Sequence, residues 1–163
     1  MNAHTPLLAA TLLLSACQPA DEKEIGLREL IHHDDFVYSV RQVTVQDSIG
    51  SLKPKGRFWI VTFRVDNQAV RIAHPWGNNT PYVRDPGGKV YENLPKAQQR
   101  LNQLRPFGWR SKYKTPARQS DSTRLVFDLP KTVRQPYLQV RGEVLLGDVL
   151  DRRQFKRTKV RLF

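Results

Sequence analysis

Residues 58–65, with the sequence FWIVTFRV, decide the fold of this chain. Their side chains alternate, and four apolar ones share one face of an extended strand: Trp59, Val61, Phe63 and Val65. The opposite face starts with a phenylalanine and an isoleucine, so it is partly apolar too. A strand that is apolar on much of both faces is typical of a sheet covered on both sides. We therefore expect 58–65 to be a central strand.

Other short segments carry the alternation or the residue types of strands. They are Phe36–Val45, Thr123–Leu129, Tyr137–Leu145 and Arg157–Phe163. In the first of them the apolar period changes phase partway along, which predicts a β-bulge. In the last, cations alternate with apolar residues, so one face of that strand is cationic.

The inward residues of the second segment, which include Leu125 and Phe127, have the same alternation as those of the central strand. We expect Leu125 and Phe127 to face Trp59, Val61 and Phe63 across two packed sheets. These five side chains would then form the core.

Two local motifs predict the remaining elements. The segment Tyr82–Tyr91 contains Asp-Pro-Gly-Gly at 85–88, which predicts a hairpin closed by a tight turn. The segment Pro95–Leu104 starts with proline and has apolar residues at helical spacing, which predicts a short helix. Six or seven short strands separated by turn signals favour an all-β fold, an antiparallel β-sandwich. Because Cys17 is the only cysteine, the sandwich has no intramolecular disulfide.

Three stretches in this order resemble a known family: residues 56–67 (GRFWIVTFRVDN), the 82–91 hairpin and residues 124–130 (RLVFDLP). They are similar to the telokin-like, immunoglobulin-like domains of bacterial secreted proteins and lipoproteins, the immunoprotective extracellular antigen type. The resemblance covers about 36–141 and implies an immunoglobulin-like β-sandwich of about seven strands. Its motifs are structural, so for function it implies only binding or cell-surface roles.

The N-terminus carries a lipoprotein signal. Leu7–Leu14 is an apolar run too short to span a bilayer, and it leads into Leu14-Ser15-Ala16-Cys17, which resembles the bacterial lipobox. We expect 1–16 to be a signal peptide and Cys17 to be the site of lipid attachment. The alternative is an apolar N-terminus with an incidental buried cysteine. Gln18, rather than aspartate, follows the cysteine, which favours the periplasmic face of the outer membrane if the host has two membranes.

The next segment is acidic, whereas the rest of the chain is strongly basic. Residues 18–35 hold six carboxylates and two cations, in a chain with 27 Lys and Arg against 15 Asp and Glu. We expect 17–35 to be an acidic tether, with a brief helical turn at Ile25–Ile31. The sandwich domain would then span 36–163 and end in a basic extension, 145–163. The cations at 152–161 are also what an edge strand charged against aggregation would carry.

A second basic region gives the candidate binding residues. Residues 96–118 contain no carboxylate, and their cations are interleaved with aromatic side chains. The residues expected to contact a polyanion are Lys96, Arg100, Arg105, Trp109, Arg110, Lys112, Lys114 and Arg118. Single-stranded nucleic acid would suit such a pattern, but export argues against that partner. If the segment binds a ligand, anionic lipid or an envelope polymer is the expected one. The favoured interpretation is a solvated loop whose aromatic side chains cap the sandwich.

No catalytic, metal or cofactor site is legible. The run His32-His33-Asp34-Asp35 offers metal ligands, but adjacent residues of an extended chain point to opposite faces. His74 lies in a Pro/Gly loop without a nucleophile motif. We therefore expect a lipid-anchored, extracytoplasmic, non-enzymatic binding or envelope-structure module. Its expected partners are the membrane, through the N-terminal lipid, and an anionic envelope component or an envelope protein. The alternatives are a polyanion-binding protein and, less favoured, a small envelope enzyme.

Overall fold

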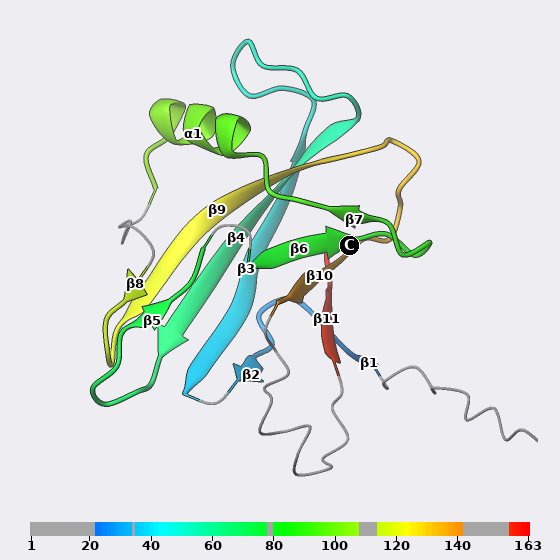
Figure 1. Ribbon diagram of the computed structural model, residues 1–163. Coiled ribbons are helices and arrows are strands. Elements are labelled where there is room, and N and C mark those ends of the chain that lie inside the picture. Colours follow the sequence, from blue (N-terminus) through cyan, green and yellow to red (C-terminus); the bar gives the residue numbers. More distant parts are fainter. Residues whose placement is uncertain (1–21, 34, 78–79, 108–113, 142–156) are drawn as a thin grey trace, which may run out of the picture.

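The computed structural model describes residues 22–33, 35–77, 80–107, 114–141 and 157–163, and it contains two packed β-sheets (Figure 1). The five-stranded sheet has the order β1 (Glu22–Ile25), β11 (Arg157–Arg161), β10 (Tyr137–Val140), β6 (Pro81–Arg84) and β7 (Val90–Tyr91). The four-stranded sheet has the order β2 (Ile31–His33), β3 (Phe36–Gln46), β4 (Arg57–Asn67) and β9 (Ser120–Leu129). A small ribbon pairs β5 (His74–Pro75) with β8 (Lys114–Thr115), and α1 spans Pro95–Leu104.

The expected all-β sandwich is confirmed, with two differences. The strands outnumber the seven that we expected, because the N-terminal segment and the small ribbon add short strands. The pairing is antiparallel throughout these sheets except between β1 and β11, which run parallel. No helix in the described ranges is both long and apolar enough to cross a membrane.

The strand β4 is central, as its alternation predicts. It pairs with β3 on one side and with β9 on the other. Val61, Phe63 and Val65 on one face are fully buried in the main core. Phe58 and Ile60 on the other face are buried in a second cluster beneath α1. Both faces are therefore covered, each by a different layer.

The predicted bulge lies in β3. The pairing with β4 runs from Val40 opposite Phe63 to Gln42 opposite Thr62, so Arg41 has no residue opposite it. The extra residue changes which side chains face the core, because side chains alternate along a strand. The phase change in the sequence is thus the signature of the bulge.

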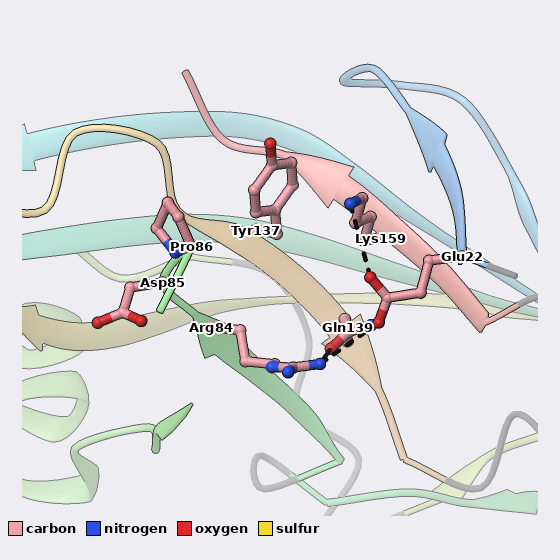
Figure 2. A pocket seen from close by; sticks show the side chains of 7 residues that line it. All are labelled: Glu22, Arg84, Asp85, Pro86, Tyr137, Gln139 and Lys159. Carbon is pink, nitrogen blue, oxygen red and sulfur yellow. Dashed lines mark hydrogen bonds and ion pairs between the residues drawn. The ribbon is translucent and has the colours of Figure 1, made fainter. Parts of the chain in front are cut away.

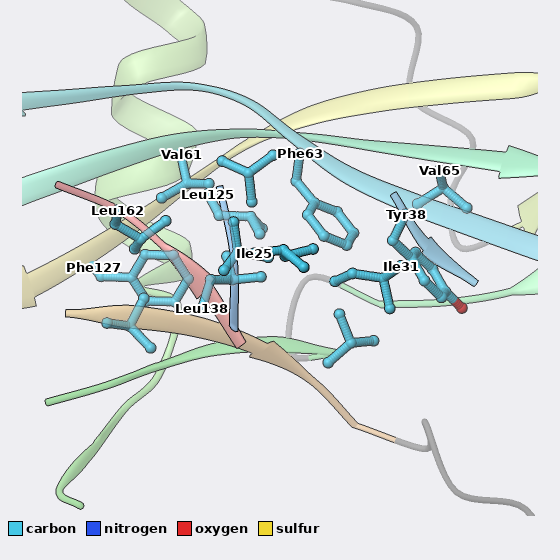
Figure 3. Packing of buried hydrophobic residues seen from close by; sticks show 14 of the residues in the cluster. Ile25, Ile31, Tyr38, Val61, Phe63, Val65, Leu125, Phe127, Leu138 and Leu162 are labelled. Carbon is cyan, nitrogen blue, oxygen red and sulfur yellow. The ribbon is translucent and has the colours of Figure 1, made fainter. Parts of the chain in front are cut away.

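The main core lies between the two sheets (Figure 3). We expected Leu125 and Phe127 to face the β4 residues across the sheets, and this part of the prediction is wrong. Leu125 is the registered partner of Val61, so these residues are neighbours within one sheet. The opposing layer comes from the five-stranded sheet, for example from Leu138 and Val160, which are fully buried.

Aromatic packing lies at one end of this core. The rings of Tyr38 and Phe63 are stacked with centroids 5.7 Å apart, and Trp76 tilts against Phe63 at 6.1 Å. Burial raises the pKa of Tyr38 to about 12, because the phenolate would lose its hydration. The hydroxyl of Tyr38 therefore stays protonated at neutral pH.

The predicted hairpin and helix are confirmed. The backbone N–H of Lys89 donates to Asp85 Oδ1 at 2.9 Å, and Gly88 takes a φ of +87°, a conformation that favours glycine. The helix α1 has the expected bounds and starts at Pro95, where the missing N–H costs little. Its buried face packs Ala97 and Leu101 on β4 and β9.

The expected acidic tether is corrected by the structure. Within 17–35, residues Glu22–Ile25 and Ile31–His33 are strands, so the helical turn expected at Ile25–Ile31 does not form. Ile25 is 3% exposed and Ile31 is 1% exposed, and both belong to the main core. The sandwich therefore includes residues from Glu22 onward. The local sequence did not show them as core, because the exposed Leu27 and Leu30 lie beside them and the segment has no strand alternation.

The last strand confirms the alternation predicted for it, but it does not lie at the edge of the sheet. Thr158, Val160 and Leu162 face inward and are buried, while Arg157 and Lys159 point outward, as the alternation predicts. However, β11 lies between β1 and β10, so it is not an edge strand. The larger part of the expected extension 145–163, up to residue 156, lies outside the described residues, as does the end of the strand expected at 137–145.

Replacing Phe63 or Phe127 with alanine removes a fully buried ring and leaves a cavity. Each change should lower the free energy of unfolding by about 3–5 kcal/mol. Val70→Ala is the control, because Val70 is 62% exposed. Urea unfolding followed by tryptophan fluorescence would measure the loss. If Phe63→Ala and Phe127→Ala were as stable as Val70→Ala, the core would be assigned wrongly.

Ile25→Ala tests whether the segment that contains Ile25 is a strand of the sandwich or a tether. Because Ile25 is a core residue, its truncation to alanine should lower the free energy of unfolding by about 2–5 kcal/mol. Leu27→Ala, in the turn that follows, should be nearly neutral because Leu27 is 40% exposed. Thermal melts would compare the two variants. Equal melting temperatures would mean that residues 22–33 are a tether and not part of the sandwich.

Candidate functional site

The cations expected to contact a polyanion lie on different elements. Lys96 and Arg100 are exposed on α1, and Arg105 follows the helix. Lys114 is in β8, and Arg118 lies in the turn after it, with a φ of 58°. Figure 1 shows α1 and β8 at separate places along β9. Trp109, Arg110 and Lys112 lie outside the described residues, as does Cys17. The described cations of 96–118 thus fall into two groups.

A loop that is distant in sequence, 47–56, lies beside the group of cations on α1. An added side-chain carbon at Gly50 would lie 3.1 Å from Leu104 Cδ1 and 3.3 Å from Arg100 Nε, so the 47–56 loop packs beside the helix. This loop carries the exposed cations Lys53 and Lys55. We call Lys53, Lys55, Lys96, Arg100 and Arg105 the α1 surface. It also exposes apolar side chains, since Leu104 is 46% exposed.

The sequence offers histidines as metal ligands, and the described residues contain no metal-binding cluster. No three His, Cys, Asp or Glu side chains there are grouped so as to hold a metal ion. Of the run His32-His33-Asp34-Asp35, Asp34 lies outside the described residues. His33 packs its ring 6.5 Å from that of Tyr38. His74 begins the short strand β5.

A small pocket that the sequence did not predict lies on the outer face of the five-stranded sheet (Figure 2). Its volume is about 90 Å³. Four strands and the hairpin turn supply its lining: Glu22, Arg84, Asp85, Pro86, Tyr137, Gln139 and Lys159. Alternation explains this placement, because the neighbouring residues Val83, Leu138 and Val160 point into the core. We call these seven residues the sheet pocket.

Gln139 is the centre of the polar contacts in the sheet pocket. Its Nε2 donates to Glu22 Oε1 at 3.2 Å, and its Oε1 accepts from the Tyr82 hydroxyl at 3.2 Å. Arg84 Nη1 donates to Glu22 Oε1 at 3.3 Å and to Gln139 Oε1 at 3.5 Å. Gln139 is only 2% exposed although it points outward. The surrounding side chains therefore cover it and hold it in place.

Opposite charges join β1 to β11 along this face. Lys159 Nζ lies 3.5 Å from Glu22 Oε2 and 3.6 Å from Glu24 Oε2. Arg161 Nε lies 3.2 Å from Glu24 Oε1. The acidic N-terminal segment thus neutralises part of the cationic face of the last strand. Such partly exposed pairs each contribute at most about 1 kcal/mol.

The aromatic side of the sheet pocket is Tyr137. Lys159 Nζ lies 4.8 Å from the centre of its ring, and the ring of Phe163 meets it edge-on at 5.7 Å. On the neighbouring strand, the Arg141 guanidinium lies 4.6 Å from the centre of the Tyr82 ring. These cation–π contacts fix two tyrosine rings on one sheet face.

Asp85 is oriented by the hairpin. Its Oδ2 accepts a hydrogen bond from the Tyr91 hydroxyl at 2.9 Å. Burial raises the pKa of Tyr91, and the hydrogen bond to Asp85 and its negative charge raise it further. The Tyr91 hydroxyl therefore remains a donor to the carboxylate at neutral pH.

A further polar cluster, at the end of β4, is structural. Arg64 Nε donates to Asp66 Oδ1 at 2.8 Å, and the Ser120 hydroxyl also donates to Asp66. Burial alone would raise the pKa of Asp66, but the hydrogen bonds from Arg64 and Ser120 and the charges of Arg64 and Arg41 together lower it. The cluster ties β4 to β9.

Comparisons with known proteins identify solved structures with a similar fold. The chain is similar to a conserved hypothetical protein from Bacillus anthracis, with a TM-score of 0.56, 16% identity, and coverage of 73% of this chain and 91% of that one. It is similar to the secreted protein MPT63 from Mycobacterium tuberculosis, with a TM-score of 0.52, 13% identity, and coverage of 76% and 92%. An uncharacterized β-sandwich protein from Clostridium difficile has a TM-score of 0.52 and 10% identity, with coverage of 90% and 97%.

These likenesses define the class of the protein as a β-sandwich, and at such identities they show the fold alone. None of the three names specifies an enzyme. No protein-family model matches the chain, and no curated protein sequence matches it.

Proposed function

We propose that this protein is a lipid-anchored, extracytoplasmic β-sandwich that acts by binding rather than by catalysis. The observation that carries the proposal is the lipobox-like sequence ending at Cys17, followed within five residues by β1 at Glu22. A lipidated cysteine in this position would attach the acyl chains almost directly to the folded domain. The secreted protein among the structural neighbours is compatible with this compartment.

The short spacing constrains how the domain would sit on a membrane. Five residues of extended chain span at most about 18 Å. Since β1 and β11 are parallel and start at the same end, Glu22 and Arg157 would lie nearest the bilayer. The domain would therefore have little freedom to move away from the membrane.

The non-enzymatic part of the proposal is supported by the kind of residues that gather on the surface. The sheet pocket consists of mutually paired charges and an aromatic ring, with no serine, cysteine or histidine in its lining. A nucleophile beside a base is what covalent catalysis would need. The sheet pocket and the α1 surface instead carry charged side chains, accompanied by an aromatic ring in the first and by Leu104 in the second, which are suited to binding a ligand.

A second candidate function, binding of an anionic lipid or envelope polymer, is favoured by the α1 surface. Five cations from two segments, together with the exposed apolar side chain of Leu104, are present there. Cations attract anionic headgroups or polymers, and apolar side chains add contact area. The nearby carboxylate of Asp128 accepts hydrogen bonds from the backbone N–H groups of Lys55 and Gly56, so it is engaged with the base of the loop.

Cys17→Ser tests the anchor. The wild-type protein should partition into the membrane fraction, because each buried CH₂ of an acyl chain contributes about 0.8 kcal/mol. The serine variant should be soluble or unprocessed. Ser15→Ala is the matched control, since alanine keeps a small residue in the lipobox and should leave the protein in the membrane. Intact mass would decide the matter: an unmodified Cys17 thiol in the mature wild-type protein contradicts the proposal.

A pair of double variants tests the second candidate. Lys96→Gln with Arg100→Gln removes two cations from the α1 surface, and Arg71→Gln with Arg118→Gln removes two cations elsewhere. In co-sedimentation, the affinity for phosphatidylglycerol vesicles should fall about thirtyfold for the first pair, at about 1 kcal/mol for each cation near the surface, and much less for the second. Equal losses would show attraction by net charge alone, and no binding at low salt would reject this candidate.

A further inference from the structure

The sheet pocket has a balanced charge, which restricts the ligands that it suits. The cations Arg84 and Lys159 are matched by the carboxylates of Glu22 and Asp85. An anionic ligand would be attracted by the first two and repelled by the second two, and the reverse holds for a cation. The cluster therefore favours a neutral ligand, unlike the cationic α1 surface.

The polar groups of the sheet pocket are donors and acceptors at fixed positions. The guanidinium of Arg84 donates, the carboxylate of Glu22 accepts, and the amide of Gln139 does both. Their mutual contacts of 3.2–3.5 Å hold these three planar groups side by side. Gln139 is covered, so Arg84 and Glu22 are the members of the row that a ligand can reach. A hydroxyl group donates and accepts at once, so adjacent hydroxyl groups can bond to Arg84 and to Glu22. A polyhydroxylated ligand thus fits the row better than an apolar or singly functional one.

The other side of the sheet pocket is apolar. In Figure 2, Tyr137 and Pro86 lie on the side opposite Arg84 and Gln139. The contacts of Tyr137 with Lys159 and Phe163 hold its ring in place before any ligand arrives. A pyranose ring has polar edges and faces rich in C–H groups, and such a face packs on an aromatic ring. The pocket therefore offers a surface for each aspect of a sugar ring.

The size of the sheet pocket means that it would enclose only part of a ligand. Pockets that enclose small molecules have volumes of about 300–1,000 Å³. The sheet pocket, at about 90 Å³, is much smaller. Tyr82, the registered neighbour of Gln139, lies next to the pocket on the same face of the sheet. One sugar unit in the pocket could thus be flanked by further units along the sheet.

The geometry points to the sheet pocket as a binding site for a neutral glycan segment. Tyr137 and Pro86 contact the face of one sugar ring, and Arg84 and Glu22 bond to its hydroxyl groups. Gln139, which is 2% exposed, holds the Arg84 and Glu22 side chains in place from below. This names the ligand class of the binding module, and it depends on the proposed function only for the compartment, where glycan polymers of the cell envelope are available.

The test is a titration of the chain from residue 17 onward, carrying Cys17→Ser, with a β-1,4-linked tetramer of N-acetylglucosamine. Amide chemical shifts in ¹H–¹⁵N spectra would locate the contact. We expect saturable shifts centred on residues 82–86 and 137–139, and no such shifts with inorganic phosphate at the same concentration. Shifts produced by phosphate alone, shifts centred on α1, or no shifts at millimolar tetramer would overturn the proposal.

Variants at Tyr137 and Arg84 then assign the contacts. Tyr137→Ala should weaken tetramer binding about tenfold, whereas Tyr137→Phe keeps the ring and should bind like the parent. Arg84→Gln, at a partly exposed position, should also weaken binding and provides a second measurement should Tyr137→Ala fail to fold. Parental affinity in both Tyr137→Ala and Arg84→Gln would refute the site. Because this chain is unlipidated, the result is independent of whether Cys17 carries lipid.

Discussion

The structure depends on the burial of both faces of β4. An apolar face on each side requires a covering layer on each side, and the chain supplies two different ones. The five-stranded sheet covers Val61, Phe63 and Val65, while α1 and the 47–56 loop cover Phe58 and Ile60. The molecule is thus three layers deep at β4. As a result, the sheet pocket and the α1 surface lie on the two outermost layers and face away from each other.

This arrangement bears on the binding proposed for the two surfaces. The two surfaces differ in chemistry as well as in position, since one has balanced charge with fixed tyrosines and the other is cationic. A single small ligand cannot reach both of them. A protein attached by a lipid at Cys17 could contact one envelope component through the sheet pocket and another through the α1 surface. The fold would then act as a spacer between two partners.

The pairing of β1 with β11 joins the N-terminus to the core. The ion pairs of Glu22 and Glu24 with Lys159 and Arg161 are partly exposed, so they contribute little free energy individually. Burial of Ile25 and the backbone hydrogen bonds of the parallel pair contribute more. The charges instead favour this register, because sliding β1 would place glutamates away from their cations. Glu22 also lines the sheet pocket, so the first strand of the sandwich supplies one residue of the candidate site.

The sequence by itself determined the features that depend on neighbouring residues. The alternation in 58–65, the phase change in β3, the Asp-Pro-Gly-Gly turn and the helix at Pro95–Leu104 are local patterns, and each of them correctly predicts its element. Only the tertiary structure decided the rest. The segment 22–33 looked like an acidic tether because it has no strand alternation, and Ile25 and Ile31 become core only when the last strand and β3 lie beside them. The sheet pocket was invisible for the same reason: its residues come from four strands and a turn that are far apart in the chain, and only sheet pairing brings them together.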